Sequence, residues 1–158
     1  MPSFLNNRKA YTALSIFTGA FLLRCLLNLI FFLRYGWFSS HLIEIWYYYG
    51  VAKNVFSLSW LDPTFPILRL TGLLIPPGVL YQAVAFQAAL LSALTALAIF
   101  LWLDSVYDRR AALWGGIVFS ILPSPLTLSL VNFSHDIVQV PLLVLFFWAV
   151  QSSLKKEA

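Results

Sequence analysis

The sequence contains little charge and a single cysteine, and both shortages narrow the classes of protein it can encode. Of its 158 residues, ten are basic and six are acidic, whereas 61% are hydrophobic. Because charged side chains keep long segments in water and are costly in hydrocarbon, a chain this apolar is not expected to fold as a soluble domain. The lone Cys25 excludes an internal disulfide, and the Cys and His spacings of structural zinc sites are missing.

The charged residues lie in short clusters that leave four apolar windows, each close to the roughly 20 residues needed to cross about 30 Å of hydrocarbon. These windows cover about residues 11–33, 83–103, 111–131 and 136–154. The sequence therefore predicts an all-α membrane protein, a single transmembrane domain over residues 1–158 with about four transmembrane helices. Pro123 and Pro125 are expected to kink or break the third span.

The segment between the first two spans, residues 34–82, is mixed in character. Its part from His41 to Trp60 interleaves polar and aromatic residues with few helix breakers, which favours an amphipathic helix in the headgroup layer. Prolines at positions 63, 66, 76 and 77 then favour turns or short helices, because proline cannot donate a backbone hydrogen bond. We expect a structured loop at one membrane surface.

The basic residues that flank the spans predict the orientation of the chain. Six of them are expected on one side of the membrane, namely Arg8, Lys9, Arg109, Arg110, Lys155 and Lys156. Three are expected on the other side, namely Arg34, Lys53 and Arg69. The side with more basic residues is expected to be cytoplasmic, which places both termini there and the 34–82 loop outside. A bacterial inner membrane is the favoured location, with the endoplasmic reticulum membrane as the alternative because the C-terminal lysine pair also fits a retrieval signal. Basic residues this dispersed do not form the patch that nucleic acid requires.

Acidic residues at the expected outer face are the first candidates for chemistry. Glu44 and Asp136 each lie close to a span end, and a partly desolvated carboxylate suits a general base or a ligand of a divalent cation. The alternative is structural, with Glu44 on the solvated face of an amphipathic helix and Asp136 at a helix start, where the helix dipole favours it. His41 and His135 lie near these carboxylates, but ordinary interfacial histidines are more common than metal ligands in such a pattern.

Arg24 stands near the middle of the first span, with Asn28 one helical turn later on the same face. A charge at that depth is expensive and usually faces a protein interior or a polar cavity, so this stripe predicts a functional or assembly site. The alternatives are a side chain that snorkels to one interface, or one that pairs with a lipid phosphate or a carboxylate of another subunit. The tyrosine run that includes Tyr47 and Tyr48 is typical of an aromatic belt and less often of a sugar platform.

Taken in order, these features resemble the N-terminal part of the family C (GT-C) membrane glycosyltransferases, the group of protein O-mannosyltransferases and aminoarabinose transferases. The matching elements, over roughly residues 15 to 152, are Arg24, Glu44-Ile-Trp-Tyr47-Tyr48, Ala52-Lys53-Asn54, Pro76-Pro77-Gly78, Arg109-Arg110-Ala111-Ala112-Leu113, Pro123 and His135-Asp136. The chain departs from the family in two ways. It has the single carboxylate of Glu44 where an acidic pair is usual, and four expected spans where family members have many more.

The resemblance implies transfer of a sugar from a polyprenyl-phosphate donor to an acceptor at the outer or lumenal face, with a partner chain supplying further spans. Glu44 is then the expected base, Asp136 assists acceptor or metal binding, and Arg69 stabilises the phosphate leaving group. The expected substrate-binding set is completed by Arg24, Tyr47, Tyr48 and His135. The alternative is a non-catalytic accessory subunit of a larger membrane complex. A small channel or transporter has weak support, because the spans lack repeated polar positions.

Overall fold

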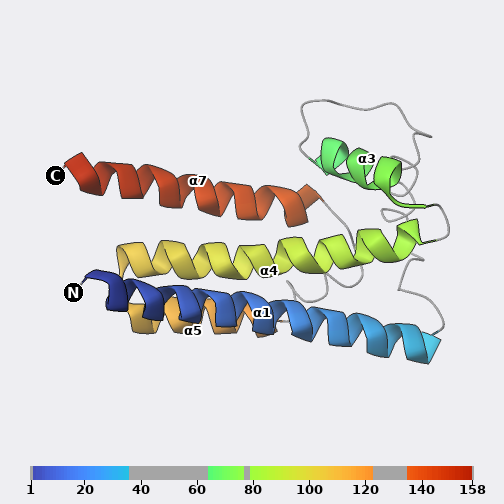
Figure 1. Cartoon of the computed structure of the whole chain (residues 1–158), viewed down its shortest axis with the longest axis horizontal. Coiled ribbons are helices and arrows are strands. Elements are labelled where there is room, and N and C mark those ends of the chain that lie inside the picture. Colours follow the sequence, from blue (N-terminus) through green and yellow to red (C-terminus); the bar gives the residue numbers. More distant parts are fainter. Residues whose placement is uncertain (1, 36–63, 77–78, 123–134, 158) are drawn as a thin grey trace.

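The computed structural model describes residues 2–35, 64–76, 79–122 and 135–157, and all the regular secondary structure in these ranges is helical. The helices are α1 (Pro2–Tyr35), α3 (Thr64–Leu74), α4 (Leu80–Val106), α5 (Arg109–Ile121) and α7 (His135–Glu157). Figure 1 shows α1, α4, α5 and α7 with nearly parallel axes and the short α3 at one end of the bundle. The beginning of α1 and the end of α7 lie together at the opposite end.

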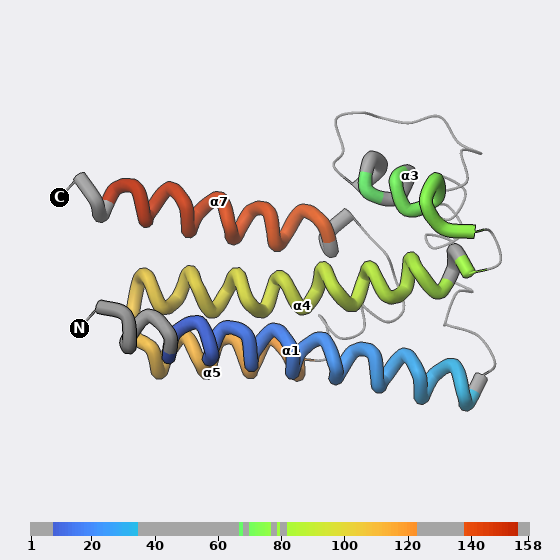
Figure 2. Tube along the Cα trace, in the orientation of Figure 1, coloured from blue at the N-terminus to red at the C-terminus, as the bar shows by residue number. Residues whose placement is uncertain are grey.

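The central helix is α4, which contacts each of the other four described helices. The trace in Figure 2 runs α1 and α4 side by side in opposite directions, with α7 on the other side of α4. The buried face of α4 is made mainly of small residues, which let helix backbones approach closely. Its fully or almost fully buried alanines are Ala88, Ala89, Ala93, Ala96 and Ala98.

Two glycines on α5 extend this close packing. A Cβ atom added to Gly115 would overlap Cδ1 of Leu103 on α4, and one added to Gly116 would lie 3.1 Å from Cγ2 of Ile16 on α1. Gly116 therefore lies against a buried cluster that includes Ile16 and Phe100. In contrast, a Cβ on Gly19 of α1 would meet nothing within 4 Å.

Most of the large apolar side chains in the described helices lie on the outside of the bundle. Leu33 on α1 is 73% exposed, and Phe146 and Leu154 on α7 are 61% and 62% exposed. Water disfavours such a surface, whereas hydrocarbon accommodates it. Two described helices, Arg8–Arg34 and Gln82–Val106, are also long and apolar enough to cross a bilayer. Large apolar groups outside and small residues inside are the arrangement of a membrane protein.

The first and second apolar windows of the sequence fall within these two long helices, so the prediction of a helix in each is confirmed. The fourth window falls in α7, whose apolar part, Val138–Leu154, is a shorter apolar helix. Only the first part of the third window, to Leu122 just after the end of α5, is described, and Pro123 and Pro125 lie outside the described residues. The expected helix over 41–60 also lies outside them, and the total of four spans stays a prediction.

Polar contacts join the helices at the end of the bundle where α1 begins. Lys9 Nζ lies 2.5 Å from Asp104 Oδ2, which pairs α1 with α4. Arg109 Nη2 donates to the backbone oxygen of Arg8 at 2.7 Å and to Oγ1 of Thr12 at 2.6 Å. The turn from α4 to α5 is fixed by Asp108, whose side chain accepts from the backbone N–H of Ala111 at 2.7 Å and so caps the new helix.

Candidate functional site

Arg24 is buried completely between α1 and α4. Its Nε donates to Oγ of Ser92 on α4 at 2.8 Å, and its Nη1 donates to the backbone oxygen of Ala20 on its own helix at 2.9 Å. Its Nη2 is buried and has no hydrogen-bond partner among the described residues. The side chain therefore joins the two longest apolar helices and does not snorkel to an interface.

The depth of Arg24 makes this arrangement unusual for a charged group. Arg24 lies 16 residues after Arg8 and ten before Arg34, the ends of the apolar stretch of α1, which correspond to about 24 Å and about 15 Å of helix. No aspartate or glutamate occurs in 10–33, 82–103, 109–122 or 137–154. Within the described part of the bundle, the guanidinium is held by neutral oxygens alone. A buried charge with so little compensation usually marks a position with a specific role.

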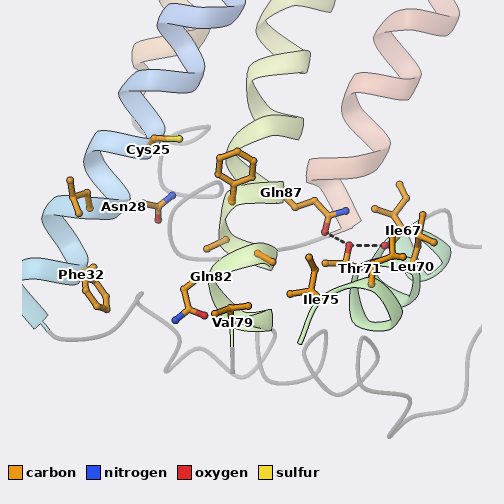
Figure 3. Close-up of a pocket in the computed structure, with 15 residues that line it drawn as sticks. Cys25, Asn28, Phe32, Ile67, Leu70, Thr71, Ile75, Val79, Gln82 and Gln87 are labelled. Carbon is orange, nitrogen blue, oxygen red and sulfur yellow. Dashed lines mark hydrogen bonds between the residues drawn. The ribbon is translucent and has the colours of Figure 1, made fainter. Parts of the chain in front are cut away.

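A pocket of about 710 Å³ lies between α1, α3 and α4, at the end of the bundle away from the termini (Figure 3). Helix α4 forms its floor, α1 one wall and α3 the other. Most of its lining is apolar and includes Phe32 and Phe86. The ring of Phe86 meets that of Phe21 edge to face with centroids 5.1 Å apart, which joins α4 to α1 beside the pocket.

Four neutral polar side chains reach into the pocket, and no charged side chain lines it among the described residues. Asn28 and Gln82 lie on the α1 side, and Thr71 and Gln87 on the α3 side (Figure 3). The Thr71 hydroxyl lies 3.0 Å from the backbone oxygen of Ile67 and 3.0 Å from Oε1 of Gln87, so it ties α3 to α4. The amides of Asn28 and Gln82 make no hydrogen bond within the described part of the chain, which leaves their donors and acceptors available.

The residues singled out from the sequence fall into three groups. Arg24 is described and buried, but it does not line the pocket, whereas Asn28 on the same helical face does. Arg69 belongs to α3, and His135 and Asp136 are the first two residues of α7. Their backbones place them at the pocket end of the bundle, where α3 and α7 touch, and their side chains are outside the described set. Glu44, Tyr47 and Tyr48 lie outside the described residues altogether.

Sequence reasoning missed the polar residues that α3 and α4 contribute. Gln82 is the last residue of the segment predicted as a loop, and Gln87 and Ser92 fall inside the predicted span 83–103, where neither is singled out from the sequence. The signal that could have found Ser92 is the requirement of Arg24 for a buried hydrogen-bond acceptor. No group of three or more His, Cys, Asp or Glu that could hold a metal ion occurs among the residues the structure describes.

Comparison with models of known protein families gives no match, and comparisons with curated proteins and with solved structures give none either. The resemblance to the GT-C enzymes therefore stays a prediction from the residues quoted above and their order along the chain. The geometry contributes independent information, namely a membrane-type helical bundle with one large neutral pocket described at the end away from its termini.

Proposed function

We propose that the chain is a GT-C-like membrane module that takes part in sugar transfer from a polyprenyl-phosphate donor at the outer or lumenal face, together with a partner chain. The observation that supports this proposal is the pocket between α1, α3 and α4. Its volume of about 710 Å³ lies within the usual range for small-molecule sites, and its largely apolar lining suits the apolar part of a substrate. The end of the bundle at which it lies is the one expected to face outward.

The location of the candidate catalytic residues along the chain agrees with this site. Glu44 belongs to the segment that connects the end of α1 to the start of α3, the two helices that form the walls of the pocket. In the proposed reaction, Glu44 takes the proton of the acceptor hydroxyl, and the acceptor oxygen forms a bond to the sugar carbon while the bond between that carbon and the phosphate oxygen breaks. The phosphate leaves on its polyprenyl chain, stabilised by Arg69, and Asp136 assists the acceptor or a divalent cation.

The proposed orientation has both termini in the cytoplasm, in a bacterial inner membrane by preference. The beginning of α1, the turn from α4 to α5 and the end of α7 share one end of the bundle, and the basic pair at 109–110 and the basic residues at 8–9 belong to it. The Lys9–Asp104 pair and the bond from Arg109 to Arg8 hold these charges together. An excess of basic residues at one end of a membrane bundle is the pattern of its cytoplasmic side.

The competing proposal, an accessory subunit, would use the Arg24 and Asn28 stripe as a docking surface for neighbouring helices. Both side chains are instead buried inside this chain, Arg24 at 0% and Asn28 at 7% exposure, and Arg24 is bonded to α4. The stripe therefore has a role within the chain, and it gives no specific support to docking.

The test is sugar transfer in native membranes that contain all partner chains, with polyprenyl-phosphate mannose and polyprenyl-phosphate aminoarabinose as alternative donors. Glu44→Gln should lower the transfer rate with one of these donors by about 100-fold or more, the usual effect of losing a general base. Glu157→Gln, a matched change in the last residue of α7, should leave the rate unchanged. Full transfer by Glu44→Gln would remove the base from the proposal. Co-purification of the chain in a stoichiometric complex of another activity would favour the accessory subunit.

A further inference from the structure

We infer that the pocket binds a neutral amphiphile, a single apolar chain with a hydroxyl-bearing head, and does not bind the phosphate of a lipid donor. The inference concerns binding, and it rests on the proposed function only in assigning this molecule the role of acceptor. Three features of the pocket carry it: the charge of its lining, the hydrogen bonds left available in it, and the exposure of its apolar rim.

The lining offers nothing that would compensate a phosphate among the described residues. Buried phosphate needs arginine or lysine partners or several backbone N–H groups, and an uncompensated buried charge is strongly disfavoured. Arg24 precedes the lining residue Cys25, yet it is fully buried and directed to Ser92 and Ala20. Three features at this end would favour a phosphate, although none is among the described lining residues: the N-terminus of α4 at Leu80, Arg34 in the last turn of α1, and Arg69, which belongs to α3. A comparison of ligands with and without a phosphate therefore decides the question.

The available polar groups match hydroxyls. An amide side chain carries both donors and an acceptor, and a hydroxyl likewise donates and accepts, so the two are complementary without any net charge. The amides of Asn28 and Gln82 have no partner among the described residues, and they project from α1 and α4 on the same side of the pocket (Figure 3). A hydroxyl-bearing head between them would complement both amides, of which Asn28 is buried and Gln82 is exposed near the start of α4.

The apolar rim gives a chain a way out of the pocket. Leu29 on α1 is 51% exposed, and Leu70 and Leu74 on α3 are 57% and 70% exposed, although all three line the pocket. The wall of the pocket is therefore continuous with the lipid-facing surface of two different helices. An apolar tail can lie along this wall and extend into the bilayer, so the length of the chain is not limited by the pocket volume.

The experiment uses the full chain in phosphatidylcholine nanodiscs and a monoacylglycerol with a photoreactive diazirine in its acyl chain. After irradiation, the labelled peptides are identified by mass spectrometry, with and without unlabelled competitor. The two competitors are monooleoylglycerol and oleoyl lysophosphatidic acid, which differ by one phosphate. Labelling should concentrate on the pocket-lining parts of α1, α3 and α4. Monooleoylglycerol should prevent this labelling at about one-tenth or less of the concentration at which oleoyl lysophosphatidic acid does so.

Two alanines, one in the pocket and one outside it, provide a test variant and its control. Ala83 on α4 lines the pocket, whereas Ala149 on α7 is exposed on the outside of the bundle. Ala83→Trp should fill the pocket and remove most of the labelling, and Ala149→Trp should leave it unchanged. The competition between the two lipids is measured on the unmodified chain, so its result does not depend on whether either variant folds.

Each outcome bears on one proposal. Equal or stronger competition by the phosphate-bearing lipid would overturn the inference, as would labelling of α7 equal to that of the pocket helices. Unchanged labelling in a folded Ala83→Trp variant would do the same. If the pocket selects the neutral lipid but no sugar transfer is found, this inference stands and the proposed function is wrong. If sugar transfer is found but the pocket does not select the neutral lipid, the proposed function stands and this inference is wrong.

Discussion

Replacing Ser92 with alanine removes the acceptor of the Arg24 Nε–H at the centre of the α1–α4 interface. The hydrogen bond is 2.8 Å long, and both side chains are buried, at 0% exposure for Arg24 and 6% for Ser92. Loss of the partner of a buried donor costs about 1–3 kcal/mol in water-soluble proteins. Comparable polar contacts in membrane proteins average about 0.6 kcal/mol and reach about 1.7. Because Arg24 is charged and its Nη2 already has no described partner, we expect about 1–2 kcal/mol of destabilisation.

Replacing Arg24, the other partner in this hydrogen bond, should have a different effect. Arg24→Leu removes the buried charge together with its need for partners, and apolar replacement of buried charged groups is often neutral. Ser92 can then bond to a backbone oxygen of its own helix, as Thr95 and Ser120 do. In the Arg24→Leu background, Ser92→Ala should therefore cost little, and a double-mutant cycle should give a coupling free energy close to the full cost of the single Ser92 change.

Equilibrium unfolding in mixed micelles, measured by steric trapping, gives the required free energies. Ser153→Ala is the matched control, because the Ser153 hydroxyl is exposed and bonds only to the backbone oxygen of Ala149 on its own helix among the described residues. A Ser92→Ala effect no larger than that of Ser153→Ala would refute the argument. A coupling free energy near zero would also refute it, since the Arg24–Ser92 bond would then contribute nothing.

Two further predictions concern the packing of α4 against its other neighbours, and both are measured by the same unfolding assay. Gly115→Ala should be less favourable than Gly19→Ala by about 1 kcal/mol, because both changes gain helix propensity but only the new methyl group at position 115 must displace the Leu103 side chain of α4. Equal effects of the two changes would contradict the packing of α5. Trp102→Phe should cost about 1 kcal/mol, because its Nε1 donates to Oε1 of Gln151 on α7 at 3.2 Å. The same change at Trp114, which is 62% exposed, should cost less, and the opposite order would contradict the α4–α7 contact.

The two long apolar helices could be predicted from the sequence because their signal is local. About 20 apolar residues between charged clusters specify a helix whatever its neighbours are. Arg24 could be singled out from the sequence because it is a charged residue within such a stretch. The proline-marked segment was less informative. Helix α3 forms there because Pro66 is only its third residue, in the first turn, where a missing backbone N–H costs little.

The pairing of helices could not be predicted, because it depends on contacts between distant residues. Arg24 and Ser92 are 68 residues apart, and the spacing of Arg24 and Asn28 indicates one helical face without indicating which helix it meets. The pocket combines residues of three helices in the same way. Thr71 reaches Gln87 only because α3 folds back onto the start of α4. Periodicity along a single segment contains no information about such a contact.

The buried arginine and the pocket are related through the rotation of α1. An interface of alanine side chains packs closely but distinguishes weakly between neighbouring rotations of an apolar helix, and a buried polar group is the best-attested means of fixing such a register. The bond from Arg24 to Ser92 turns this face of α1 toward α4. Asn28 lies one turn further along the same face, so the same rotation directs its amide into the pocket. A charge that costs stability in the middle of a membrane helix is thereby explained, because it places a polar side chain at the site proposed to bind the acceptor.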